Sequence, residues 1–302
     1  MADLDLGPIV LGGNSFGWTS NREDTFGVLD AFVEAGGTTI DTSDLYSSWV
    51  PGNTGGESET LIGEWTAERG NRDRVQIIGK VGMWAGRPGL SPDNIRAAVD
   101  DSLKRLQTDY FDFYLAHKDD DSVPQEDVVG VFDELVRAGK VRRLGVSNFS
   151  ADRLRSIVEI SRATNAAPFV VAQDKFNLVD RGYATALAPT VAELGLVEIP
   201  FYSLASGFLT GKYRPETTVD SPRAQGVTAL LDDPKNLALL DTLDRIAAAH
   251  DVSVAAVALA WLRSQPTVAA PIAGARTAAQ VAPLVESFTL VLDDDELAAL
   301  DG

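Results

Sequence analysis

The stretch around which the chain is organised runs Thr38-Thr39-Ile40-Asp41-Thr42-Ser43-Asp44-Leu45-Tyr46. Its first three residues are β-branched, follow two glycines and predict a short buried strand. The strand ends at Asp41, and Tyr46 follows five residues later in the loop beyond it. A carboxylate at a strand end and a phenol just past that end can face one cavity. Taken alone, however, the stretch favours a capping Asp and a surface Tyr.

Two later strands carry titratable residues at the corresponding position. Lys80 ends an apolar strand expected at 75–80, and His117 ends another expected at 111–117. A lone histidine is more often a satisfied core residue, and one in isolation is a weak sign of function. The carboxyl ends of parallel strands in a barrel share one face, where active sites form. We therefore expect both side chains to meet the carboxylate and the phenol of the first stretch.

Strand patterns and helix patterns alternate along the whole chain. Eight such units without a second composition regime predict an α/β fold, a single (β/α)8 (TIM) barrel domain over residues 1–302. In the C-terminal half we expect a helix at 185–194, a seventh strand at 197–202 and an eighth at 268–272. The connection 203–233 is expected to hold no element, and loops this long are usually functional or disordered.

The composition excludes several classes of protein. With 26 basic and 44 acidic residues the net charge is −18, which opposes binding to nucleic acids or anionic membranes. The chain has no cysteine and two histidines, so disulfides, thiolate nucleophiles and zinc sites are not expected. The N-terminus lacks the features of a signal peptide, and no apolar stretch approaches the ~20 residues of a membrane span, so a cytoplasmic protein is expected. The oligomeric state is not indicated.

The ordered set Asp41, Tyr46, Lys80 and His117 resembles the catalytic tetrad of the aldo/keto reductase superfamily. Further segments extend the resemblance over essentially the whole chain. These are Gly56-Glu57-Ser58-Glu59, Gly145-Val146-Ser147-Asn148-Phe149 and Leu209-Thr210-Gly211-Lys212-Tyr213. Each motif alone is weak, but the set is specific. The resemblance implies a barrel enzyme that reduces an aldehyde or ketone to the alcohol with a nicotinamide cofactor.

The resemblance also implies a role for each tetrad residue. Carbonyl reduction needs a hydride at carbon and a proton at oxygen, and Tyr46 is expected to give the proton as general acid. A free phenol has a pKa of about 10, which the ammonium of Lys80 is expected to lower. Asp41 is expected to hold Lys80 charged and oriented, and His117 to hydrogen-bond the substrate oxygen. Relatives that reduce carbon–carbon double bonds carry Glu in place of this histidine, so carbonyl reduction is expected.

Hydride transfer requires a cofactor, because protein side chains do not supply hydride. No G-x-G-x-x-G fingerprint follows an early strand, so a Rossmann site is not indicated. The resemblance implies NADPH extended across the barrel mouth, with Ser147, Asn148 and Gln173 on the carboxamide and Tyr202 stacked on the nicotinamide ring. The phosphates are expected at a loop and at a helix N-terminus opened by Gly274. The other expected cofactor-binding residues are Gly207, Leu209, Gly211, Lys212, Arg276 and Gln280. The resemblance also implies that the loop Gly12–Trp18 touches cofactor and substrate.

The chain departs from the family pattern where the adenine is expected. Many members have Lys in place of Gly274, Arg in place of Gln280 and Glu-Asn in place of Pro283-Leu284. Arg276 is therefore the one clear cation expected at the 2′-phosphate, which its planar fork suits. We expect a moderate preference for NADPH, with NADH as a weaker alternative.

Three tryptophans in strand-end loops, Trp18, Trp49 and Trp84, are expected to wall an aromatic pocket for a small-molecule carbonyl substrate. Two other functions remain open. A barrel aldolase would form a Schiff base with Lys80 but leave Tyr202 idle. A sensor or regulatory barrel with little turnover would bind the nicotinamide cofactor and keep the tetrad.

Overall fold

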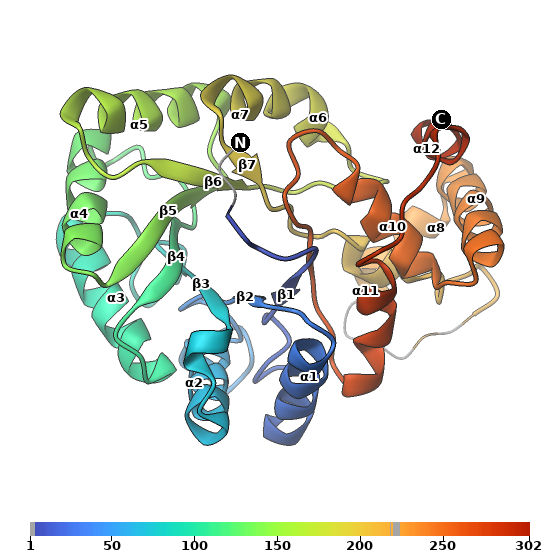
Figure 1. Ribbon diagram of the computed structural model, residues 1–302, viewed down its shortest axis with the longest axis horizontal. Coiled ribbons are helices and arrows are strands. Elements are labelled where there is room, and N and C mark those ends of the chain that lie inside the picture. The colour runs from blue at the N-terminus through green and yellow to red at the C-terminus, as the bar shows by residue number, and fades with distance from the viewer. Residues whose placement is uncertain (1–3, 218, 220–223) are drawn as a thin grey trace.

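The computed structural model of the protein describes residues 4–217, 219 and 224–302. All eight expected strands are present, and they pair in parallel within one curled sheet (Figure 1). The strands are β1 (Val10–Gly12), β2 (Thr39–Asp41), β3 (Gln76–Val81), β4 (Phe111–Ala116), β5 (Val141–Ser147), β6 (Phe169–Gln173), β7 (Val197–Glu198) and β8 (Ile272–Ala273). They follow the order β7-β6-β5-β4-β3-β2-β1-β8, so each strand lies beside its neighbours in sequence.

Backbone hydrogen bonds close the seam between β7 and β8. Glu198 N donates to Thr267 O at 2.8 Å, and Ala269 N donates back to Glu198 O at 2.8 Å. Further along, Ile272 N donates to Pro200 O at 2.8 Å. The expected single (β/α)8 barrel is therefore confirmed.

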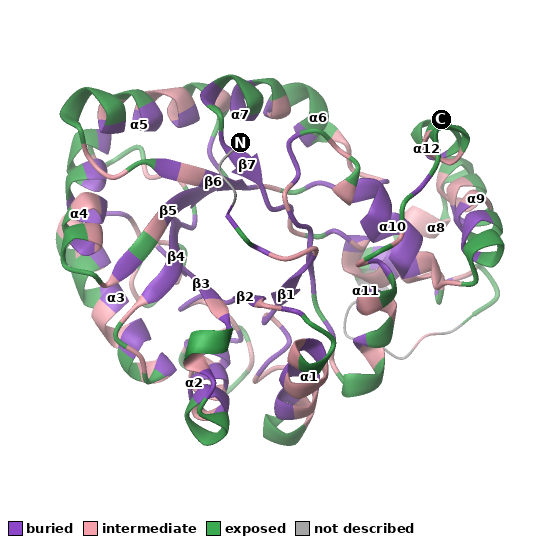
Figure 2. Cartoon of the chain, viewed as in Figure 1, coloured by how far each residue is buried: buried purple, intermediate pink, exposed green. Residues whose placement is uncertain are grey.

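Helices surround the strands, most of them with their buried side turned inward, as the purple and green of Figure 2 show. They are α1 (Arg22–Glu34), α2 (Glu57–Arg69), α3 (Pro92–Leu106), α4 (Gln125–Arg137), α5 (Ala151–Thr164), α6 (Gly182–Ala186), α7 (Ala188–Leu194), α8 (Ala224–Leu231), α9 (Pro234–His250), α10 (Val254–Arg263), α11 (Ala282–Glu286) and α12 (Asp294–Asp301). Short 3-10 helices are η1 (Arg72–Arg74), η2 (Ala205–Thr210) and η3 (Ala278–Gln280). Within the described residues no single helix could span a membrane; α9 and α10 reach the length and composition only together, bent by 96°.

The alternation of side chains along each strand decides which residues reach the mouth of the barrel. Inward positions recur every second residue and form an apolar interior cluster. On β3, Ile78 belongs to this cluster and Lys80 lies two positions on; on β4, Phe113 and Leu115 belong to it and His117 comes next. The titratable residues therefore continue the inward rows at the carboxyl ends.

Several elements of the C-terminal half differ from expectation. Strands β7 and β8 are each two residues long, because Pro200 and Pro271 lie in the expected strands and cannot donate ladder hydrogen bonds. The expected helix at 185–194 begins earlier, at Gly182, and is divided at Leu187, where Pro189 opens α7.

The connection 203–233 is not devoid of elements. It holds η2 and α8, and residues 218 and 220–223 within it lie outside the described part of the chain. Gly274 does not open a helix either: η3 begins at Ala278 and α11 at Ala282. The backbone at Gly274 instead lies against β1, where an added Cβ would meet Gly12 O at 3.0 Å.

Candidate active site

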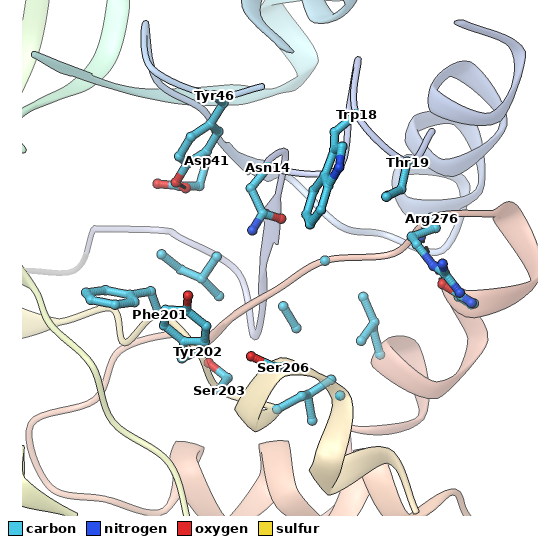
Figure 3. Close-up of a pocket in the computed structure, with 18 of the residues that line it drawn as sticks. Asn14, Trp18, Thr19, Asp41, Tyr46, Phe201, Tyr202, Ser203, Ser206 and Arg276 are labelled. Atoms are coloured by element: carbon cyan, nitrogen blue, oxygen red, sulfur yellow. Dashed lines mark hydrogen bonds between the residues drawn. The ribbon is translucent and has the colours of Figure 1, made fainter. Parts of the chain in front are cut away.

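A cavity of about 800 Å³ opens at the carboxyl ends of the strands. Its volume falls in the range of small-ligand sites, about 300–1,000 Å³. Figure 3 shows Asp41 and Tyr46 together at one end and Arg276 at the other, with Asn14 and Trp18 between them. His117, Asn148 and other residues from six strand ends complete the wall. That wall also holds Ser147, Gln173, Tyr202, Gly207, Lys212, Gly274 and Gln280.

Asp41, Tyr46 and Lys80 form one hydrogen-bonded group at the end of β2 and β3. The Tyr46 hydroxyl donates to Asp41 Oδ2 at 2.7 Å, and Lys80 Nζ donates to the Tyr46 oxygen at 2.9 Å. Lys80 Nζ lies 2.5 Å from Asp41 Oδ1 and also donates to Thr42 O at 2.9 Å. The Lys80 side chain is 0% exposed and lies beneath the cavity, whereas Tyr46 and Asp41 line it.

His117 follows β4 and stands beside the phenol. Its ring centroid lies 6.3 Å from that of Tyr46, with the planes nearly perpendicular, and both side chains line the cavity. Its Nδ1 lies 3.2 Å from Ser43 Oγ, a buried hydroxyl on the loop after β2. Of the two ring nitrogens, Nε2 makes no hydrogen bond to a described residue. Nε2 is therefore the atom available to a ligand.

Burial is the largest influence on the pKa values of Tyr46 and Lys80. It raises the pKa of Tyr46 well above its ordinary value, and the Asp41 carboxylate raises it further. Burial lowers the pKa of Lys80, and Asp41 opposes that effect. The phenol pKa is therefore raised and not lowered as expected, because burial and then the Asp41 carboxylate outweigh the effect of the Lys80 ammonium. The phenol keeps its proton across physiological pH, which is the state that a general acid requires.

Amide side chains from β5 and β6 lie next to the tetrad. Asn148 Nδ2 donates to His117 O at 3.0 Å and to Ser147 Oγ at 2.9 Å. Gln173 Nε2 donates to Asp41 Oδ1 at 3.0 Å, so the carbonyl oxygen of this amide remains for a ligand. Asn148 adopts φ 58°, which Asn tolerates better than most residues. These three polar side chains line the cavity as expected.

The backbone after β7 is strained where it lines the cavity. Tyr202, Ala205 and Ser206 have φ values of 57°, 47° and 58°. Such conformations cost about 1–3 kcal/mol each at non-glycine residues and cluster at functional sites. They leave the Tyr202 side chain 54% exposed, and Figure 3 shows Tyr202 and Ser206 on the wall opposite Trp18. Gly207 continues the bend at φ 98°.

Two cations on the cavity wall have no acidic partner. No hydrogen bond or ion pair to a described residue engages the Lys212 ammonium or the Arg276 guanidinium; Lys212 Nζ lies 5.0 Å from the Tyr213 ring. The backbone N–H of Arg276 donates to Gln280 Oε1 at 2.9 Å, which fixes the chain at that point. In a protein of net charge −18, unpaired cations in a cavity favour an anionic ligand.

Comparison with known proteins identifies the family of the chain. The model of the Aldo/keto reductase family matches residues 8–302. The chain belongs to this family. It is 31% identical to Protein tas of Escherichia coli (strain K12), over all of this chain and 95% of that protein. It is 30% identical to Aldo-keto reductase YhdN of Bacillus subtilis (strain 168), over 97% of this chain and 87% of that protein. It is 29% identical to Norsolorinic acid reductase stcV of Emericella nidulans, over all of this chain and 79% of that protein.

Most residues expected at the site of this aldo/keto reductase line the cavity; besides Lys80, which lies beneath it, three do not. Leu209 is fully buried in the core, and Gly211 packs against Val254. Trp84 turns away and lines a separate depression beside Gly55 and Arg105. In each case an adjacent residue lines the cavity instead: Met83 beside Trp84, and Thr210 between Leu209 and Gly211.

The cavity is also lined by residues that the sequence analysis did not single out. Met83 lines it where Trp84 was expected, next to the perpendicular pair of Trp18 and Trp49, whose centroids are 5.6 Å apart. Asn14 lies in the glycine-rich loop after β1, where glycines signal close approach to a ligand. Ser253, at the start of α10, carries no signal in the sequence.

Proposed function

We propose that this aldo/keto reductase reduces an aldehyde or ketone to the alcohol with NADPH. The observation that supports this most directly is the contact of Tyr46 Oη with Lys80 Nζ at 2.9 Å and Asp41 Oδ2 at 2.7 Å, at the wall of the cavity of about 800 Å³. A neutral phenol supported by a buried ion pair is arranged to give up a proton.

The cavity has the chemistry to hold an extended nicotinamide dinucleotide phosphate. The amides of Asn148 and Gln173 and the hydroxyl of Ser147 would hold the carboxamide, and Tyr202 would cover the ring. Lys212 and Arg276, both unpaired among the described residues, would hold the phosphates. When bound, the cofactor supplies the hydride.

Tyr46, Lys80, Asp41 and His117 would carry out the proton transfer to the substrate oxygen. The Tyr46 hydroxyl now donates to Asp41, and rotation about its C–O bond would turn that hydrogen into the cavity. As the proton moves to the substrate oxygen, the phenolate left behind would be stabilised by the N–H of Lys80, which Asp41 keeps in place. His117 would hydrogen-bond the same substrate oxygen through Nε2. Burial would exclude water from this group.

The substrate would enter between Trp18, Trp49, Met83 and Leu45, a mainly apolar wall at the Tyr46 end. This wall favours a neutral small molecule with an apolar body. A cytoplasmic location stays a prediction from the sequence.

A Schiff-base aldolase fits the site less well. Lys80 is fully buried beneath Tyr46 and ion-paired with Asp41, so a substrate carbonyl could not reach its nitrogen without displacing both. A cofactor-binding sensor would share the cavity, and turnover alone separates it from an enzyme.

The proposed reaction is tested by the steady-state loss of NADPH absorbance with aromatic aldehydes, ketones and an enone. We expect aldehydes to be reduced and the carbon–carbon double bond of the enone to remain, because His117 is a neutral hydrogen-bond partner suited to a carbonyl oxygen. Efficient double-bond reduction with inert aldehydes would contradict the reaction type. Binding of NADPH without turnover of any carbonyl would favour the sensor.

Cofactor choice should depend on Arg276. A charge-assisted fork to a 2′-phosphate contributes roughly 1.5–3 kcal/mol net, which predicts about a tenfold to hundredfold preference for NADPH. Arg276→Ala should weaken NADPH binding by that factor and leave NADH binding nearly unchanged, as measured by fluorescence titration. The preference should shrink as salt rises. Equal weakening of both cofactors would show instead that Arg276 supports the adenosine end generally.

A further inference from the structure

A hydroxyl and a carboxyl lie behind His117, outside the lining of the cavity. Ser43 Oγ is 3.2 Å from His117 Nδ1 and 3.1 Å from Asp44 Oδ1, and it accepts the backbone N–H of Leu45 at 3.1 Å. Ser43 and Asp44 are 0% and 1% exposed. No residue of the tetrad other than His117 contacts this pair by a hydrogen bond among the described residues. The hydroxyl therefore links the imidazole to Asp44 alone.

The Ser43 hydroxyl has a single hydrogen, and this couples the protonation of Asp44 to that of the His117 ring. A hydroxyl has one hydrogen and two acceptor sites, and the N–H of Leu45 uses one of those sites. The remaining hydrogen and site must serve His117 and Asp44. If Asp44 is ionised, it can only accept, so His117 must donate from Nδ1, and Nε2 of the neutral ring carries no hydrogen. If Asp44 is protonated and donates, the hydroxyl donates to Nδ1, and Nε2 carries the hydrogen.

The distribution of charge around Asp44 favours its protonated form. Three buried carboxyl groups lie here with two cations, and both cations are engaged: Lys80 with Asp41 at 2.5 Å and Arg105 with Glu59 at 2.7 Å. Asp44 makes no ion pair with a described residue, and its Oδ2 has no hydrogen-bond partner among them. A buried carboxylate with one unsatisfied oxygen and no cation is costly, whereas a neutral carboxyl is not.

We propose that Asp44 sets the tautomer of His117 through the Ser43 hydroxyl, so that Nε2 presents an N–H to the substrate oxygen while Asp44 is protonated. Asp44 is a positioning residue in this scheme, since it acts on the substrate only through Ser43 and His117. The catalytic consequence rests on the proposed carbonyl reduction, but the tautomer itself does not.

The link should respond to pH near neutrality. Burial, and next the nearby Glu59, raise the pKa of Asp44 to about 7, against the smaller effects of Ser43 and Arg105. Lys80 and Tyr114 are the other titratable groups that face it, from β3 and β4. Burial, followed by the Lys80 charge, holds the pKa of His117 well below its ordinary value, so the ring stays neutral. As pH rises through the pKa of Asp44, the carboxyl ionises and the hydrogen moves from Nε2 to Nδ1.

The tautomer can be read directly, without cofactor or substrate. The chain has only two histidines, and the other, His250, pairs with Glu296 at 2.7 Å on α12. A 15N-histidine-labelled protein, with His250→Gln to assign the signals, gives the two ring nitrogen shifts of His117 by long-range 1H–15N correlation. We expect the Nε2–H tautomer below pH 7 and conversion to Nδ1–H above it.

Three variants test the origin of that change. Asp44→Asn offers a neutral amide donor to Ser43 and should hold the Nε2–H tautomer over the whole pH range, while Ser43→Ala breaks the link and should make the tautomer independent of pH. Asp174→Asn is the matched control: it removes another carboxyl, half-buried, whose pKa burial also raises to about 7, and should leave the conversion as in the parent. A tautomer that does not change with pH in the parent, or converts equally in Asp44→Asn, would overturn the proposal.

The same variants separate this proposal from the proposed function. In an active enzyme, loss of the Nε2–H donor should lower kcat/KM about tenfold above pH 7, and Asp44→Asn should remove that decline. If the tautomer converts as expected but no carbonyl is reduced, the link stands and the proposed reaction fails. If carbonyls are reduced while the tautomer is fixed at Nδ1–H, the reaction stands and the link is wrong.

Discussion

Replacing Tyr46 by Phe should lower kcat at least ~10²-fold, the usual scale for losing a general acid. The ring would remain, so the shape of the cavity should change little and cofactor affinity should be nearly the same. The loss follows from geometry: the Tyr46 hydroxyl lines the cavity and contacts the ammonium of Lys80 at 2.9 Å, whereas the Asp41 carboxyl, which also does both, is the ion-pair partner of that ammonium. Steady-state rates with an aromatic aldehyde and NADPH measure it.

A second phenol in the same barrel gives the control for this experiment. Tyr114 on β4 is fully buried, and its hydroxyl has no hydrogen-bond partner among the described residues. Tyr114→Phe removes the same atom from the same neighbourhood and should leave kcat unchanged. If Tyr46→Phe turned over normally, or if both variants lost activity equally, Tyr46 would not be the acid.

The position of Asp41, Lys80 and His117 could be predicted because each ends an apolar strand, and the carboxyl ends of parallel strands share one face of a barrel. In parallel strands the inward rows alternate strictly, so apolar residues at Ile78 and Phe113 fix the direction of Lys80 and His117 before any contact is known. The short strands β7 and β8 could be predicted only in part, because their pairing depends on prolines whose missing N–H matters at particular register positions.

Loop residues and charges were harder to predict than strand ends. Whether Met83 or Trp84 faces the cavity depends on the backbone after β3, where Gly82 takes φ 108°. The direction of the Tyr46 pKa shift depends first on how far the phenol is buried and then on the Asp41 carboxylate beside it, and a sequence gives neither. The carboxyl of Asp44 stands in the first stretch of interest, but its partner Ser43 and its lack of a cation appear only in three dimensions.

Replacing Lys80 by Met should affect activity and stability together. Loss of a preorganised donor to a developing anion costs about 10²–10³ in kcat. The same change leaves the Asp41 carboxylate buried without its cation, and breaking a buried pair in this way costs about 3–5 kcal/mol of unfolding free energy. Lys212→Met is the control: this ammonium lies on the cavity wall without an acidic partner among the described residues, so its loss should weaken NADPH binding and leave unfolding unchanged.

The double variant Asp41→Asn/Lys80→Met separates the two effects. It leaves no buried charge, and Gln173 can turn its amide to suit either oxygen or nitrogen at position 41. Because neighbouring charges couple by about 0.5–3 kcal/mol, its unfolding free energy in urea should lie above that of Lys80→Met alone. Its kcat should stay low, since neither stability nor packing replaces the N–H that stabilises the phenolate. A double variant whose stability loss equals the sum of the single losses would mean that Asp41 and Lys80 do not act as a pair.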